Sequence, residues 1–173
     1  EYIVEVHALL KADTAWAKAG YEVAWGQTVV GRAAAPAAEW EGTIRTAWGI
    51  HNFGVYGADF SVLFSTQWGS LQSVKYNGRE YLKKLPKPVY WRAATQNDNG
   101  NKHSFRCGTW REASMTQKFV GYKITERTAH RATIVFSYQL WCDRDDTVSV
   151  AYTVDAAGTI TVKAVYPGCA GKP

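Results

Sequence analysis

The feature that most constrains the fold is an alternation of apolar and polar residues with a period of two, repeated along much of the chain. Successive side chains of a β-strand point to opposite faces, so this period predicts strands with one face in a core. It appears in residues 2–10, 60–64 and 147–166. Residues 130–142 show it most clearly, with one face formed by Ile134, Phe136, Tyr138, Leu140 and Cys142. We therefore predict an all-β fold, an antiparallel β-sandwich.

Turn-forming residues separate the predicted strands. Asn77-Gly78 lies between two strand-like runs, and Asn-Gly is the strongest short-range signal for a β-hairpin. Residues 155–158, which end in Gly158, interrupt the alternation of 147–166 and predict a second hairpin. The polar run 97–101 is rich in turn formers and predicts a loop.

Helix is expected in only two short segments. Asp13–Gly20 has an Asp that could cap the first turn and a Gly that could end the helix, and Thr109–Gln117 is the other candidate. A small-residue stretch at 31–41 has no periodicity and is typical of a linker. The predicted parts are residues 1–40, which end one β domain, a linker at 41–51, and a sandwich domain at 52–173.

Composition and charge exclude several classes of protein. No run of about 18 apolar residues exists, so no membrane-spanning helix is predicted. Residues 75–127 hold 12 Lys/Arg against 4 Asp/Glu, with aromatic residues among them, which a nucleic-acid surface could share. The cations have strand-like spacing and no nucleic-acid motif accompanies them, so we favour a solvated sheet face. Three widely spaced cysteines favour free thiols in a reducing compartment, hence a cytoplasmic protein.

Residues with catalytic chemistry are few. A glycosidase needs two carboxylates that flank the scissile bond, and the only tight acidic cluster comprises Asp143, Asp145 and Asp146. That cluster lies between two predicted strands, as a solvated turn does. His103 and Cys107 are four residues apart, but no second ligand pair follows at metal-site spacing. The sequence predicts no catalytic residue and no metal site.

Four residues could contact a sugar. Aromatic rings stack on pyranose rings, and Arg, Asn and Asp hydrogen-bond to hydroxyl groups. Trp91, Arg92, Asn97 and Asp98 offer this combination. The alternative, which we favour, is that Trp91 belongs to the core and that Arg92 pairs with Asp98 to hold the loop.

Two longer stretches carry a resemblance to a known family. Residues 13–27 read D-T-A-W-A-K-A-G-Y-E-V-A-W-G-Q. They resemble the W-A-x-x-G-H-E-V-A-W-x-Q segment of large microbial β-galactosidases of glycoside hydrolase family 2, with Tyr21 in place of the usual His. In that family the segment ends an immunoglobulin-like domain that follows the catalytic barrel.

The second stretch combines residues 69–80, G-S-L-Q-S-V-K-Y-N-G-R-E, with residues 91–100, W-R-A-A-T-Q-N-D-N-G. It is similar to G-x-L-x-S-x-x-x-x-G-x-E followed by F-W-R-A-P-T-D-N-D-x-G, which opens the same enzymes' C-terminal domain. Ala94 replaces a common Pro and Gln96 a common Asp, which weakens any polar role for that loop. The resemblance continues through Trp110 and residues 147–168, and covers nearly the whole chain.

The resemblance implies a fragment, in agreement with a start at Glu1 and a single methionine. It implies a partial galactose-mutarotase-like supersandwich preceded by immunoglobulin-like strands. The family's catalytic glutamates lie on the barrel, and no motif here matches them, so the fragment alone is expected to be inactive. The turn formed by Asn77, Gly78 and Arg79 is expected to face the active site.

The partners implied by the resemblance are the rest of the β-galactosidase chain, including its catalytic barrel, and a galactoside substrate. No nucleic acid or membrane is expected. No cofactor is expected in the fragment, and Mg²⁺ and Na⁺ are candidate metals of the parent enzyme. Two alternatives stay open: an independent carbohydrate-binding module that uses Trp91 or Trp110, and an interaction domain carried on a separate small subunit.

Overall fold

The computed structural model describes residues 2–31 and 41–168, without the side chains of residues 144–146. By its internal contacts the chain divides into two units, Glu1–Glu39 and Trp40–Pro173. None of the helices in the described ranges has the length and apolar content needed to cross a membrane.

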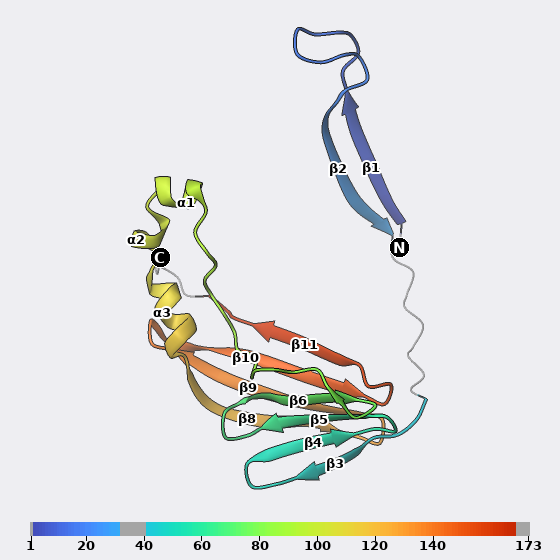
Figure 1. Ribbon diagram of the computed structural model, residues 1–173, viewed down its shortest axis with the longest axis vertical. Helices are drawn as coiled ribbons and strands as arrows, with labels where there is room; N and C mark the ends of the chain where they lie inside the picture. Colours follow the sequence, from blue (N-terminus) through green and yellow to red (C-terminus); the bar gives the residue numbers. More distant parts are fainter. Residues whose placement is uncertain (1, 32–40, 169–173) are drawn as a thin grey trace. The chain divides into compact units, whose positions relative to one another are not determined.

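The first unit is a single antiparallel hairpin of β1 (Tyr2–Leu9) and β2 (Glu22–Gly31), shown in blue in Figure 1. Every side chain of β1 is exposed, on both faces. The predicted strand at 2–10 is confirmed, but the helix predicted at Asp13–Gly20 is wrong. Asp13 does not cap a helix: its carboxylate accepts hydrogen bonds from the Ala19 backbone N–H and the Lys18 ammonium, and so closes the loop between the two strands.

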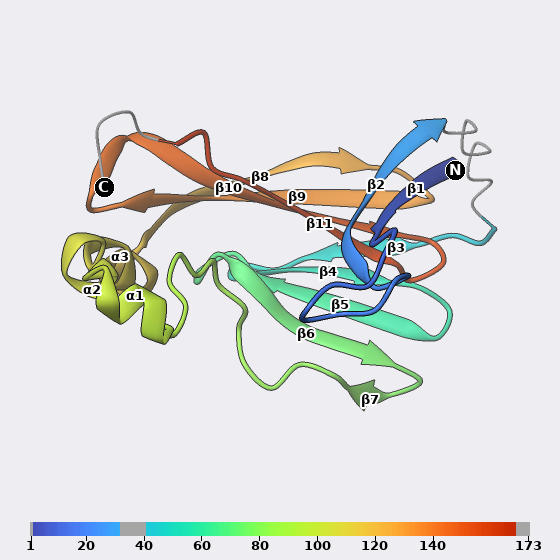
Figure 2. The same ribbon diagram turned by 90° about the horizontal axis from the view of Figure 1, so that it is seen from above.

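The second unit contains two antiparallel sheets that lie face to face (Figure 2), which confirms the predicted all-β sandwich. One sheet has the order β3-β4-β5-β6-β7 and the other the order β11-β10-β9-β8. The strands of the first are β3 (Arg45–Trp48), β4 (Asn52–Tyr56), β5 (Phe60–Ser65), β6 (Ser70–Tyr76) and β7 (Arg79–Glu80). Those of the second are β8 (Lys118–Arg127), β9 (Arg131–Leu140), β10 (Asp143–Asp155) and β11 (Ile160–Val165).

Aromatic rings from both sheets fill the core. The ring centroid of Phe64 on β5 lies 6.2 Å from that of Phe136 on β9 and 5.5 Å from that of Tyr152 on β10. Phe136 is fully buried, as are Ile134 and Leu140 two and four residues away along the strand direction. The alternation that predicted a strand at 130–142 therefore also identified its buried face.

Strand β3 lies within the segment 41–51, which the sequence led us to expect as a linker. It pairs with β4 over four residues, and the Trp48 ring packs edge-on against Phe53 at 6.0 Å. The small-residue stretch ends before this point, and Thr46 and Trp48 pair with the buried residues Val55 and Phe53 of β4. The assignment of residues 1–40 and 52–173 to particular domains of the family stays a prediction.

Both predicted hairpin turns are present. Asn77 and Gly78 join β6 to β7 with φ angles of 49° and 76°, the left-handed conformation that a type I′ turn requires at both positions. Between β10 and β11, the Asp155 carboxylate accepts hydrogen bonds from the backbone N–H groups of Ala157 and Thr159. The turn predicted at residues 143–146 is wrong: these residues begin β10, and Asp143 pairs with Leu140 ahead of a register shift.

Three short helices lie together at one end of the sandwich (Figure 2): α1 (Gln96–Gly100), α2 (His103–Arg106) and α3 (Thr109–Thr116). Helix α3 confirms the prediction at Thr109–Gln117. The loop predicted at 97–101 is wrong, because α1 occupies most of it. Thr95 and Asp98 form a reciprocal capping box, in which each side chain binds the other's backbone N–H, and this starts a helix from residues that otherwise favour turns.

Candidate functional site

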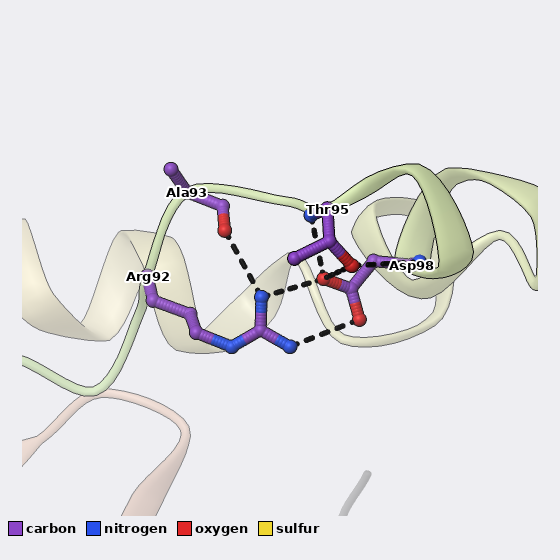
Figure 3. A network of polar contacts seen from close by, with 4 residues as sticks. All are labelled: Arg92, Ala93, Thr95 and Asp98. Carbon is purple, nitrogen blue, oxygen red and sulfur yellow. Dashed lines mark hydrogen bonds and ion pairs between the residues drawn. The ribbon is translucent and has the colours of Figure 1, made fainter. Parts of the chain in front are cut away.

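The segment that holds the four sugar-contact candidates is organised around one carboxylate (Figure 3). The guanidinium of Arg92 donates to both oxygens of Asp98, from Nη1 to Oδ2 at 2.6 Å and from Nη2 to Oδ1 at 3.0 Å. The backbone N–H and the hydroxyl of Thr95 also donate to Oδ2, at 2.7 and 2.8 Å. Asp98 is nearly buried, whereas the Arg92 side chain is mostly exposed. Both oxygens of the Asp98 carboxylate thus already accept hydrogen bonds.

These contacts hold the pKa of the Asp98 carboxyl well below its usual range, with the Arg92 hydrogen bond as the largest cause and the Thr95 N–H next. The same pair raises the pKa of Arg92. Asp98 is therefore a charged structural anchor that joins the segment before Thr95, which lies in no strand or helix, to the start of α1. The contact agrees with our favoured interpretation of these two residues, in which they hold the loop.

Trp91 stacks on the ring of His103 in α2, with centroids 5.1 Å apart and planes 11° apart. Trp91 is partly buried rather than a core residue, and Asn97 is exposed on α1. Sugar contact by these two residues stays a prediction. The structure brings Trp91, Arg92 and Asp98 into one short region next to α1 and α2.

The other predicted group, Asn77, Gly78 and Arg79, forms the exposed tip of the β6–β7 hairpin. The Asn77 backbone N–H donates to the Asp59 carbonyl oxygen at 2.7 Å, which ties the tip to the β4–β5 turn. Beside it is a shallow hollow lined by residues of both turns, namely Ala58, Asp59, Phe60, Ser61, Lys75, Asn77 and Gly78. The Arg79 guanidinium lies over the Tyr81 ring, 5.5 Å from its centroid.

Glu80, the acidic residue of the second motif, fixes the base of this hairpin. One carboxylate oxygen accepts hydrogen bonds from the backbone N–H groups of Val74 and Leu82, both at 2.9 Å, and the other accepts from the Ser73 hydroxyl. The Ser73 hydroxyl is the largest cause, ahead of the two N–H groups, of a pKa lowered to about 2. Sequence reasoning did not single out Glu80 for this role, although the motif that carries the resemblance contains it.

The structure does not bring the two predicted groups together. The β6–β7 tip and the helices α1–α3 lie toward opposite ends of the sandwich (Figure 2). A single sugar molecule therefore does not contact both groups in this unit. The β6–β7 tip and the helical end are therefore two separate candidate sites.

Asp143 belongs to neither group, and its burial was not expected. The sequence suggested a solvated acidic cluster, but Asp143 is 1% exposed and its carboxylate accepts a hydrogen bond from the Tyr166 hydroxyl at 2.8 Å. Tyr166 in turn packs against Tyr90 and Trp110. The hydrogen bond between Asp143 and Tyr166 thus ties β10 to the segment after β11. Among the described side chains, which leave out those of residues 144–146, no group of three or more His, Cys, Asp or Glu could hold a metal ion.

The described fold is that of an antiparallel β-sandwich module that carries a separate β-hairpin unit. Residues 56–170 match the family model described as "Beta galactosidase small chain", and residues 1–31 match the model "Beta-galactosidase, domain 4". The chain therefore belongs to the β-galactosidase small-chain family, which confirms the resemblance seen in the sequence.

Similar proteins extend this result. The chain is 37% identical to a β-galactosidase of Clostridium acetobutylicum over all of its length and 19% of that protein, and 36% identical to one of Halalkalibacterium halodurans over 99% of its length and 17% of that protein. It is also 36% identical to a β-galactosidase small subunit of Latilactobacillus sakei, over 69% of this chain and 44% of the subunit. The chain spans less than a fifth of the first two relatives, so it is a fragment of a larger protein.

Proposed function

We propose that this chain is a non-catalytic accessory portion of a β-galactosidase that hydrolyses terminal β-D-galactosides with retention of configuration. The observation that carries the proposal is that both units match β-galactosidase models, in the order hairpin and then sandwich. Retaining hydrolysis needs two carboxyl groups about 5 Å apart in an accessible site. The carboxylates of Asp98 and Asp143 serve structural contacts instead, with Arg92 and Thr95 in one case and with Tyr166 in the other.

The finer proposal is that the β6–β7 tip helps to shape the galactoside pocket of the larger enzyme. Asn77 and Arg79 are exposed, and the backbone beneath them is fixed by Glu80 and by the hydrogen bond to Asp59. A rigid turn can hold an amide and a guanidinium at defined positions, and both groups hydrogen-bond well to sugar hydroxyls. Trp91 and Asn97 remain the candidates for a separate sugar contact at the helical end.

The proposal is tested at two levels. The isolated chain should not hydrolyse o-nitrophenyl β-galactoside, and turnover by pure material would contradict it. In the longer enzyme, Asn77→Ala and Arg79→Ala should raise KM several-fold with a smaller change in kcat, because a pocket wall binds ground and transition states alike. Arg127→Ala, which removes an exposed arginine at the end of β8, is the matched control. Equal kinetics for Arg79→Ala and Arg127→Ala would remove the pocket-shaping role.

A second candidate role is that of an interaction domain, favoured by the match to the small subunit of Latilactobacillus sakei. In that case the chain would bind a separate polypeptide that carries the catalytic barrel. Co-expression with that polypeptide and co-purification would support this role. The third candidate, an independent sugar-binding module, predicts heat of galactose binding to the isolated chain in calorimetry, lost in Trp91→Ala.

Two further properties of the parent follow from the same proposal. A cytoplasmic location is supported by Cys107, which is a free thiol in the described part of the chain. A requirement for Mg²⁺ or Na⁺ is assigned to the longer enzyme rather than to this portion. Activity of the longer enzyme after dialysis against a chelator would test the Mg²⁺ requirement.

A further inference from the structure

Helix α2 presents an aromatic side chain to solvent. The Phe105 side chain is 90% exposed, the largest exposed fraction of any aromatic residue in the described ranges. Exposure of a phenylalanine ring to water is unfavourable relative to its burial. A single exposed apolar residue needs no explanation by itself. The residues that hold and surround Phe105 give it one.

The backbone beneath Phe105 is fixed from several sides. The N–H groups of Phe105 and Arg106 both donate to the Lys102 carbonyl oxygen at 3.0 Å, and the Cys107 N–H donates to the His103 carbonyl oxygen at 2.8 Å. Lys102 adopts the left-handed conformation, with a φ of 59°, which is unfavourable for a residue other than glycine. This makes the sharp turn from α1 into α2. His103 is held in turn by its stacking on Trp91.

The charges around Phe105 are positive. Lys102 and Arg106 flank it and are both exposed, and Arg111 follows on α3. The acidic residues of the same helical region are Asp98, which is already paired with Arg92, and Glu112. Aromatic and arginine side chains are typical anchors of protein interfaces. A partner that accepts them needs an apolar pocket with a rim of carboxylates.

We propose that Phe105, Lys102 and Arg106 form a docking surface for an acidic, apolar-centred surface in the part of the larger enzyme that lies outside this chain. The inference rests on the proposed function in that it places the chain within that enzyme. More than four-fifths of each full-length relative lies outside the match, so most surfaces that this unit meets are there. A second copy of the chain would bring like charges together. A nucleic acid would be expected to use several aromatic residues in a row rather than one.

The test measures the accessibility of Phe105 directly, by hydroxyl-radical footprinting of the isolated chain and of the longer enzyme. Oxidation of Phe105 should fall at least about tenfold in the longer enzyme, as expected for a central anchor that is fully desolvated. The matched reference is Ile50, which is also 90% exposed but lies on the β3–β4 turn. Equal oxidation of Phe105 in both proteins would overturn the proposal. Because the measurement does not depend on hydrolysis, a negative result would leave the proposed function intact.

The charge requirement is tested by substitution. Arg106→Glu in the longer enzyme should restore oxidation of Phe105 several-fold, whereas Arg127→Glu, at the end of β8, should not. The melting temperature of the isolated chain should be the same with Arg106→Glu as without it, which shows that the substitution acts on docking rather than on folding. No recovery of oxidation with Arg106→Glu would overturn the role of charge. Phe105-dependent binding of a 20-nucleotide single strand by the isolated chain would overturn the protein partner.

Discussion

The hairpin unit and the sandwich unit show what the same sequence pattern yields with and without a second layer. Residues 2–9 of β1 alternate much as residues 131–140 of β9 do, yet every side chain of β1 is exposed, whereas alternate side chains of β9 are buried. In the sandwich, a second sheet lies over the apolar face, with Phe64 against Phe136 and Tyr152. Period-two alternation therefore predicts a strand with a face to bury, but it does not tell whether the covering layer is in the same chain.

The contrast also separates what each unit can do alone. A two-stranded hairpin is marginally stable in water, because its backbone hydrogen bonds are exposed and it buries little apolar area. The exposed Val6, Val23 and Trp25 of this hairpin are the kind of residues that pack in a core. A unit with such a surface is expected to depend on other polypeptide for its stability.

The largest expected effect is seen when the two units are separated. A peptide of residues 1–31 should show no stable strand structure in circular dichroism or in amide NMR spectra. A chain of residues 41–173 should retain the strand signal of the sandwich and unfold cooperatively. The physical reason is that the core residues, from Phe53 to Val154, all lie in the second unit.

Two outcomes would break this comparison. A peptide 1–31 with dispersed amide signals would show that the hairpin is stable by itself. A melting temperature of the 41–173 chain that is several degrees below that of the whole chain would show that the hairpin stabilises the sandwich.

The next effect compares one residue from each unit. Phe136→Ala should lower the free energy of unfolding of the sandwich by about 3–5 kcal/mol, because it removes a fully buried ring and leaves a cavity. Val6→Ala in the hairpin should change the free energy of unfolding by less than about 0.5 kcal/mol, because the Val6 side chain is 65% exposed. Urea unfolding followed by tryptophan fluorescence gives both values. Comparable losses for the two variants would mean that Val6 is buried in the folded chain.

The alternating pattern was enough to predict β1, β5, β9, β10 and β11 and the buried face of β9, and the turn-forming residues predicted both hairpin turns. Two of the wrong predictions fall where a side chain competes for backbone hydrogen bonds. Asp13 closes a loop instead of capping a helix, and Thr95 with Asp98 starts a helix within a turn-rich run. The sequence analysis interpreted Asp13 as a helix cap and residues 97–101 as turn formers, but the sequence did not specify which backbone N–H groups these side chains bind.

The site was less predictable than the fold. The pairing of Arg92 with Asp98 could be proposed because the two residues are close in sequence. The burial of Asp143 and its contact with Tyr166, 23 residues away, depend on how β10 and the segment after β11 come together. The separation of the β6–β7 tip from α1 depends in the same way on the packing of the sheets. Local patterns do not contain this long-range geometry.

The smallest effect concerns one glutamate in each unit. Glu80 of the sandwich accepts three hydrogen bonds, two of them from backbone N–H groups, whereas Glu22 of the hairpin lies 2.7 Å from Nδ1 of His7 with both side chains about half exposed. Glu80→Gln keeps the shape but removes the charge that these donors stabilise. It should lower the melting temperature of the sandwich by a few degrees at pH 7, while Glu22→Gln should leave it unchanged.

The pH dependence makes this prediction specific to the charge. The pKa of Glu80 is lowered in the folded chain from 4.5 to about 2, so its carboxylate stabilises the fold at pH values above 4.5, where it is charged in both states. As the pH falls from 4.5 toward 2, the unfolded chain binds a proton before the folded chain does, and this stabilisation is lost. The difference in melting temperature between the parent chain and Glu80→Gln should therefore shrink over that interval. A difference that is constant from pH 7 to pH 3 would show that Glu80 acts through its shape or packing rather than through its charge.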